Sequence, residues 1–280
     1  MIGGSILKIF TYYDYIKSIH CVKRNFINGL AEESEKYNLI PEKHNKEEYN
    51  LQYKLIKEIL EDKKEIVNLV NKFLKPNNKI AEQNIEKYTY NYMSKKYKSK
   101  KASILYRTKD KDIYFLVEHQ SKIDYNLPYK ILNYCIDIVQ EWKKERKNKV
   151  SKYPIIVPIV VYTGKDRFNI PRNYENQQIR LTLCEENRMK FSYNLIDINS
   201  YSINELLKNR TIFSYILIMG KSKNKEEFIR NIKLIIEKES KKEILNKIWN
   251  IIKQFYGEFL KENEQKELLK IINNKIDKEK

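Results

Sequence analysis

One segment of the sequence is apolar almost without interruption, Tyr153–Tyr162 (YPIIVPIVVY), and Thr163-Gly164 follows it. Its length and its β-branched residues favour a strand. A strand with one solvated face alternates apolar and polar residues, so continuous apolarity predicts a strand that is covered on both faces. Pro158 cannot donate a backbone hydrogen bond, which predicts a bulge or a free edge at that point.

A hairpin and a helix are predicted before this strand. Ala102–Arg107 and Asp112–Gln120 are rich in β-branched and aromatic residues, and the polar Thr108–Lys111 between them predicts a hairpin turn. Leu127–Lys144 has an apolar stripe at helical spacing. Because parallel strands of one sheet need a crossover connection, the order hairpin, helix, strand predicts an α/β fold with a mixed sheet flanked by helices.

The rest of the chain divides into regions of different pattern. The remaining predicted elements are a helix over Glu47–Leu74, a strand over Phe191–Ile198, and helices over Asn204–Met219 and Asn224–Asn274. We therefore expect a poorly patterned N-terminal segment at 1–45, an α/β core at 46–200, and a mostly helical C-terminal region at 201–280.

The cysteine content and the hydropathy of the sequence indicate the kind of cellular environment in which the protein folds. The three cysteines, Cys21, Cys135 and Cys184, are odd in number and far apart, which argues against a disulfide framework and against a cysteine metal site. No apolar stretch reaches the roughly 18 residues of a transmembrane helix, and the start of the chain does not resemble a signal peptide. These features predict a reducing, cytoplasmic setting without a membrane partner.

The chain is strongly basic, with 55 Lys and Arg residues against 37 Asp and Glu residues and a net charge of +18. This balance favours a polyanionic partner, most commonly nucleic acid. An abundance of Lys, Asn, Ile and Tyr is also typical of AT-rich genomes, so the position of the charges matters more than their total. Two basic windows stand out, Lys87–Lys111 and Lys143–Lys152, and each is either a solvated surface or a binding surface. Tyrosines interleave the first window, which suits contact with a nucleic-acid strand.

The strand at Asp112–Gln120 ends in polar residues. Because side chains alternate along a strand, Glu118 and Gln120 project from one face and His119 from the other. A carboxylate at the end of an apolar strand is costly unless it has a partner or a cation. Either the strand simply emerges into solvent here, or Glu118 and Gln120 belong to a site.

Four segments together favour the second reading. They are Ile104–Arg107, Phe115–Lys122, Leu127–Tyr134 and Pro154–Gly164, and in this order the sequence resembles the Rpn family of recombination-promoting nucleases, also called putative YhgA-like transposases. The resemblance covers roughly residues 47 to 220. It implies a PD-(D/E)XK, restriction-endonuclease-like fold and a metal-dependent DNA endonuclease associated with DNA recombination and mobile elements.

The resemblance also implies a catalytic site on the hairpin. The family pattern has Asp on the first strand and Glu-x-Gln on the second, which here correspond to Ser103, Glu118 and Gln120. Mg²⁺ or Mn²⁺ would be bound by the Glu118 carboxylate and the backbone carbonyl of His119, without a small-molecule cofactor. A neutral hydroxyl cannot replace a carboxylate, so Ser103 predicts weak or absent nuclease activity. The alternative is an inactive DNA-binding or partner-binding module that keeps the fold.

Basic residues near this hairpin are candidates for binding the DNA backbone. They are Lys96, Lys98, Lys100, Lys101, Arg107 and Lys130. Lys130 lies in the first turn of the predicted crossover helix, and Asp124 just before it either sits in a solvated turn or holds a basic side chain. RNA binding by the Lys- and Tyr-rich stretch is a further alternative.

Overall fold

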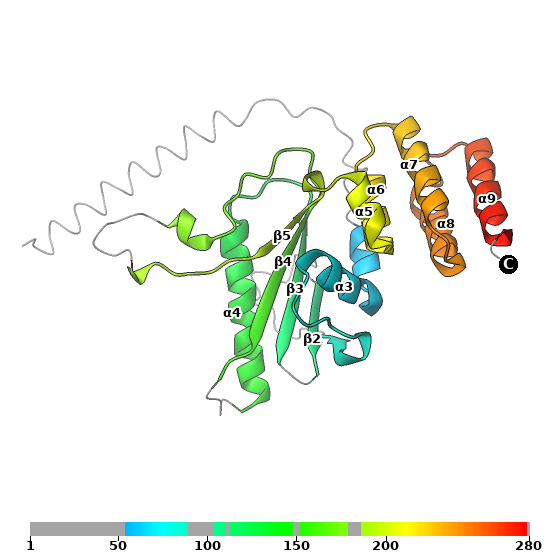
Figure 1. The fold of residues 1–280 in the computed structure, drawn as a ribbon. Coiled ribbons are helices and arrows are strands. Elements are labelled where there is room, and N and C mark those ends of the chain that lie inside the picture. Colours follow the sequence, from blue (N-terminus) through cyan, green and yellow to red (C-terminus); the bar gives the residue numbers. More distant parts are fainter. Residues whose placement is uncertain (1–53, 89–103, 110–111, 148–151, 179–185, 279–280) are drawn as a thin grey trace, which may run out of the picture. The chain divides into compact units, whose positions relative to one another are not determined.

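A sheet of five strands organises the part of the chain that the structure describes (Figure 1). This computed structural model describes residues 54–88, 104–109, 112–147, 152–178 and 186–278, all of which lie in one compact unit, Glu47–Lys280. The strands follow chain order across the sheet: β1 (Ile85–Lys87), β2 (Ile104–Thr108), β3 (Ile113–Gln120), β4 (Ile155–Tyr162) and β5 (Asn194–Asp197).

The sheet is mixed, as predicted. β1, β2 and β3 pair antiparallel, and β3, β4 and β5 pair parallel. The predicted hairpin is confirmed by the pairing of Ile104 with Val117, and the Thr108 hydroxyl accepts a hydrogen bond from the Ile113 N–H at 3.1 Å beside the turn. The predicted crossover is also confirmed, because α4 (Leu127–Glu145) joins β3 to β4.

Pro158 lies where the neighbouring strand has not yet begun. β5 pairs with β4 only from Ile159 onward, and the Asn194 amide donates to the Pro158 carbonyl at 3.1 Å. The carbonyl and nitrogen of one strand residue point to the same side, so the nitrogen of Pro158 also faces the side of β5. The predicted free edge is therefore the part of β4 that precedes this pairing.

Each face of the sheet packs into its own apolar core. On one face Leu105, Leu116 and Val160 pack with α4, and we call this the α4 face. On the other face Val117 and Val161 belong to a larger core that includes the helices before β1 and after β5. In Figure 1, α4 (green) lies on one side of the strands and α3, α5 and α6 lie on the other. This double coverage agrees with the prediction for β4 from Pro158 to Tyr162, which is buried, whereas Ile155 at the start of the strand is 61% exposed.

The helix predicted over Glu47–Leu74 is broken within its described part. A helical segment at 54–60 is followed by α3 (Lys63–Leu69) and by a π-helical turn, η1 (Val70–Leu74). The break is capped by Asp62, whose carboxylate accepts from the Lys64 N–H at 2.9 Å. Apolar spacing continues through this break, which is why periodicity alone missed it. η2 (Glu82–Asn84) then leads into β1.

The two long helices predicted after residue 200 are also divided. The segment predicted as one helix over Asn204–Met219 forms two, α5 (Ile203–Asn209) and α6 (Ile212–Gly220), separated by Arg210 with a left-handed φ of 51°. The later prediction contains three helices: α7 (Lys225–Lys238), α8 (Lys242–Tyr256) and α9 (Glu262–Asp277). Short 3-10 turns, η3 (Tyr174–Gln177) and η5 (Ile198–Ser200), flank β5. Among the described residues, no helix is both long and apolar enough to cross a membrane.

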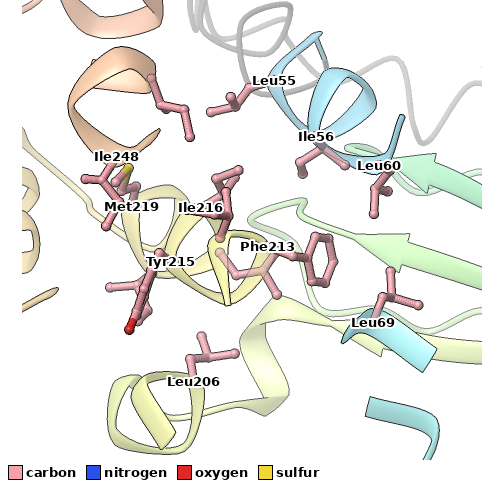
Figure 2. Packing of buried hydrophobic residues seen from close by; sticks show 14 of the residues in the cluster. Leu55, Ile56, Leu60, Leu69, Leu206, Phe213, Tyr215, Ile216, Met219 and Ile248 are labelled. Atoms are coloured by element: carbon pink, nitrogen blue, oxygen red, sulfur yellow. The ribbon is translucent and has the colours of Figure 1, made fainter. Parts of the chain in front are cut away.

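Helix α6 is enclosed on all sides. Every residue from Ile212 to Met219 is buried, as expected for a helix that is apolar around its whole circumference. Figure 2 shows Phe213 between Leu60 and Leu69 on one side of α6, and Met219 beside Ile248 of α8 on the other. The N-terminal helices and the C-terminal helices therefore share one core around α6.

Two buried carboxylates bind α6 through hydrogen bonds. Glu65 of α3 is only 3% exposed, and it accepts from the Phe213 N–H at 2.9 Å and from the Asn68 amide at 3.2 Å. Burial raises the pKa of Glu65. Glu239 accepts from the Tyr215 hydroxyl at 2.6 Å. The first turn of α6 thus obtains a hydrogen-bond acceptor from a helix that lies far away in the sequence.

We predict that Glu65→Ala lowers the free energy of unfolding by roughly 2 kcal/mol, because it leaves the buried Phe213 N–H without an acceptor. Glu65→Gln should cost less, since an amide oxygen can still accept that hydrogen bond. Urea denaturation followed by circular dichroism measures both changes. Glu58→Ala is the control, because Glu58 is exposed on the helical segment that precedes the break at Asp62; equal losses for the residue 58 and residue 65 alanine variants would contradict the capping role.

Candidate active site

Glu118 lies near the end of β3 on the α4 face, which packs into an apolar core. Its backbone pairs with Val160 of β4, and Leu116 precedes it on the same face. The side chain is buried, with 5% exposure. Leu127 and Ile131 of α4 belong to the core on this face. The polar end of β3 therefore does not simply emerge into solvent, because the structure keeps this carboxylate largely away from water.

Gln120 holds the Glu118 carboxylate directly. Its Nε2 donates to Oε1 of Glu118 at 2.9 Å. The alternation of side chains along β3 predicts this shared face. A primary amide has two donor hydrogens and an acceptor oxygen, so Gln120 can bind the carboxylate and a water molecule at the same time. The pair therefore combines a buried carboxyl group with an amide that can orient water.

His119 faces the opposite core. It is 6% exposed, and its Nε2 lies 2.8 Å from the Thr163 hydroxyl. Burial lowers the pKa of His119 to about 4, so the imidazole is neutral at pH 7. Its side chain is thus on the other side of the sheet from Glu118. The role predicted for His119 concerns only its backbone carbonyl, so it does not require the imidazole to lie on the same face as Glu118.

Several predicted site residues lie outside the described residues. They are Ser103, at the position of the expected Asp, and the basic candidates Lys96, Lys98, Lys100 and Lys101. The described part of β2 begins at Ile104, which pairs with Val117. Within the described residues, no group of three or more His, Cys, Asp or Glu side chains is arranged to hold a metal ion.

Arg107 is held by carboxylates. Its Nε lies 2.7 Å from Glu86 and its Nη1 lies 3.2 Å from Glu145, and the guanidinium stacks 4.6 Å from the centre of the Tyr88 ring. The side chain is 30% exposed. Its predicted role was to contact DNA phosphates, but in the described structure its charge is compensated by two acids that lie 21 and 38 residues away in the sequence.

Lys130 is also paired. It forms an ion pair with Asp124, whose carboxylate accepts in addition from the Asn126 N–H at 3.1 Å. Asp124 therefore holds a basic side chain, which was one of the two readings of its position. The pair fixes the loop between β3 and α4, directly after Gln120. In the second basic window Arg146 is likewise paired, with Asp112 at 2.6 Å.

The register adds one acidic residue that the sequence reasoning missed. Gln120 pairs with Tyr162, and Tyr162 pairs with Asp197 at the end of β5. These three residues therefore occupy one row at the carboxyl ends of parallel strands. Loops at such ends commonly form ligand sites in α/β sheets, which is the signal that could have identified Asp197.

The Tyr-x-Gly sequence at the end of β4 has a structural reason. A Cβ on Gly164 would lie 2.2 Å from the Tyr162 hydroxyl oxygen, so no larger residue fits against this ring. The Tyr162 hydroxyl donates to the Asp166 carbonyl at 3.0 Å, and the Asn199 amide donates to the Gly164 carbonyl at 2.9 Å. The loop after β4 is thereby fixed to the end of β5.

Comparison with known proteins identifies a family. The family described as "Putative transposase, YhgA-like" matches residues 52–247, which include the whole sheet and the helices up to part of α8. No curated protein and no solved structure shows a significant match. The matched range covers well over half of the chain and includes Glu118 and Gln120. The chain therefore belongs to the family of YhgA-like putative transposases.

Proposed function

We propose that this protein acts on DNA as a PD-(D/E)XK-type nuclease of the Rpn kind, with metal-dependent phosphodiester hydrolysis that is weak because Ser103 stands where a second carboxylate is expected. Membership in a transposase family is compatible with a role in DNA recombination or at mobile elements. The observation that carries the proposal is the Glu118–Gln120 pair. The pair places a carboxyl group and an amide side by side at the end of β3, and a carboxylate is a ligand that hard divalent cations prefer.

The residues present fit a hard divalent cation. Mg²⁺ is commonly bound by one or two carboxylates, with water and substrate phosphate filling the other positions. Glu118 offers one carboxylate and the backbone of His119 offers a carbonyl oxygen. When bound, the cation would polarise a phosphoryl oxygen and acidify a water molecule. Gln120 would orient that water, and the apolar neighbours of Glu118 would limit access of bulk solvent.

The alternative function is a DNA-binding or partner-binding module that does not cut. Ser103 favours it, because a serine hydroxyl supplies no negative charge to the cation. Such a module would bind DNA equally well with and without a divalent ion. Metal dependence therefore separates the two functions, whereas salt dependence does not, since both would lose affinity through counterion release.

We predict slow nicking of supercoiled plasmid that requires Mg²⁺ or Mn²⁺ and that falls at least 10-fold in Glu118→Gln, because the variant removes the only carboxylate assigned to the cation. Agarose gel electrophoresis over several hours measures it. Glu226→Gln is the matched control, as Glu226 is exposed on α7. Nicking that is insensitive to chelator or to Glu118→Gln would refute the nuclease, and metal-independent binding without nicking would establish the alternative.

A second prediction concerns Ser103. Ser103→Asp should raise metal-dependent nicking at least 10-fold, because it adds the missing charged ligand. Ser103→Ala should change the rate by less than about 3-fold, since a neutral hydroxyl contributes little to binding a hard cation. The combination of Ser103→Asp with Glu118→Gln should lose the gain. If the nicking rate of the double variant stays raised, residue 103 does not act together with Glu118.

A third prediction separates the side chain of His119 from its backbone. The folded-state pKa of about 4 lies below the unfolded value of about 6.5, so the unfolded chain takes up the proton first. This contribution to stability is complete above pH 6.5 and is lost as the pH falls toward 4, by up to about 3 kcal/mol.

His119→Gln should therefore flatten the pH dependence of the free energy of unfolding between pH 6.5 and 4. Metal-dependent nicking at pH 7.5 should stay within a few-fold of wild type, because the backbone carbonyl is retained. Urea titrations at several pH values and the plasmid assay measure the two effects. A complete loss of nicking in a variant that is folded at pH 7.5 would assign the imidazole to the active site instead.

A further inference from the structure

A cavity of about 560 Å³ opens beside the loops that follow β4 and β5. Three basic side chains line it, Lys165, Arg167 and Arg172, together with Asp197 and Asn199. Phe168 and Ile170 contribute apolar surface on the inner side, where they belong to the core of the α4 face. The cavity thus combines a packed base with a cationic rim, as sites for small anionic groups do.

The loop that carries the basic residues is held at several points. The Phe168 ring packs edge-on against Tyr162, with 4.9 Å between ring centres, and the backbone of Asp166 accepts from the Tyr162 hydroxyl. The Asn169 amide donates to the Tyr125 hydroxyl at 3.3 Å. The loops after β3 and β4 therefore contact each other at Tyr125, and the basic rim is attached to the same structure that carries Gln120.

The cations of this rim differ from the basic residues near Glu118. Within the described ranges, no carboxylate forms an ion pair with Lys165, Arg167 or Arg172. Arg107 and Lys130, by contrast, are each paired with acids. The acid in the cavity, Asp197, accepts from the Asn199 N–H at 2.9 Å, so part of its hydrogen-bonding capacity is used within the turn η5. Among the described residues, the rim therefore carries a net positive charge that no ion pair compensates.

The cavity lies near the candidate active site. Gln120, Tyr162 and Asp197 form one row across β3, β4 and β5, and two strand spacings amount to roughly 10 Å. The side chains of Gln120 and Asp197 project from the same face, because alternation places them on the side of Leu116 and Leu195, which both pack in the α4-face core. A nucleic-acid backbone with one phosphate at Glu118 can thus place a nearby phosphate of the same strand at the rim.

We propose that this cavity binds a phosphate group, with Arg167 and Arg172 as its main ligands. Guanidinium groups bind phosphate oxygens through paired hydrogen bonds, which suits two arginines on one rim. The inference rests on the proposed function in one respect: the phosphate is taken to belong to a nucleic-acid backbone, close to the phosphodiester bond that would be hydrolysed at Glu118. The same chemistry would also accept free inorganic phosphate, and the experiment distinguishes the two sources.

The test compares Arg167→Ala/Arg172→Ala with Arg230→Ala, an exposed arginine on α7. Fluorescence anisotropy with a labelled 20-base-pair duplex, over a series of salt concentrations in the presence of chelator, measures affinity without cleavage. The double variant should bind at least 10-fold more weakly, and its dependence of log K on log salt should be lower by about 1 to 2, because up to two phosphate contacts are lost. Arg230→Ala should match wild type.

Each other outcome is decisive. If wild type binds the duplex and the double variant binds as well as Arg230→Ala, the cavity is not a phosphate site, while the proposed function stands. If wild type binds the duplex neither in chelator nor with added Mg²⁺, the proposed function fails, and the experiment with inorganic phosphate then tests the cavity alone. A rise in melting temperature with 10 mM phosphate that is absent from the double variant would establish a free-phosphate site, and no rise would overturn the inference.

Discussion

The enclosure of α6 is the constraint on which the rest of the fold depends. A helix that is apolar on every side cannot lie at a surface, so it must be surrounded by other elements. Here α3, α5 and α8 and one face of the sheet belong to the core that contains it. Glu65 accepts a hydrogen bond from its first turn although the two residues lie 148 positions apart. The C-terminal helices and the sheet are thereby parts of one packed structure.

Because of this packing, neighbouring residues of β3 lie in different environments on the two faces of the sheet. The face opposite α4 packs into the core that contains α6, and His119 is buried on it as a neutral residue beside the Thr163 hydroxyl. The α4 face carries Glu118 and Gln120 at the end of the strand. Strand alternation places His119 on one face and Glu118 and Gln120 on the other. His119 can therefore contribute to the core without contacting the Glu118 carboxylate.

The sequence predicted the hairpin, the crossover helix and the strand β4, whose burial is confirmed from Pro158 onward, because these depend on local pattern and on rules of chain connection. It did not predict the breaks at Asp62 and Arg210, since apolar spacing continues across both. Alternation was sufficient to place Glu118 beside Gln120. The pairing of Arg107 with Glu145 was not predictable, because it depends on how α4 packs against the sheet, and no local pattern records that.

The distribution of paired and unpaired cations refines the meaning of the net charge of +18. A paired arginine near the site, such as Arg107, gains little from a phosphate unless it gives up its carboxylates. The cations at Lys165, Arg167 and Arg172 have no such competition from the described acids. The phosphate site proposed for this cavity would bring a polyanion to Glu118 from the side of β5. The placement of these cations therefore indicates the side from which a polyanion would approach the site, which the net charge alone does not indicate.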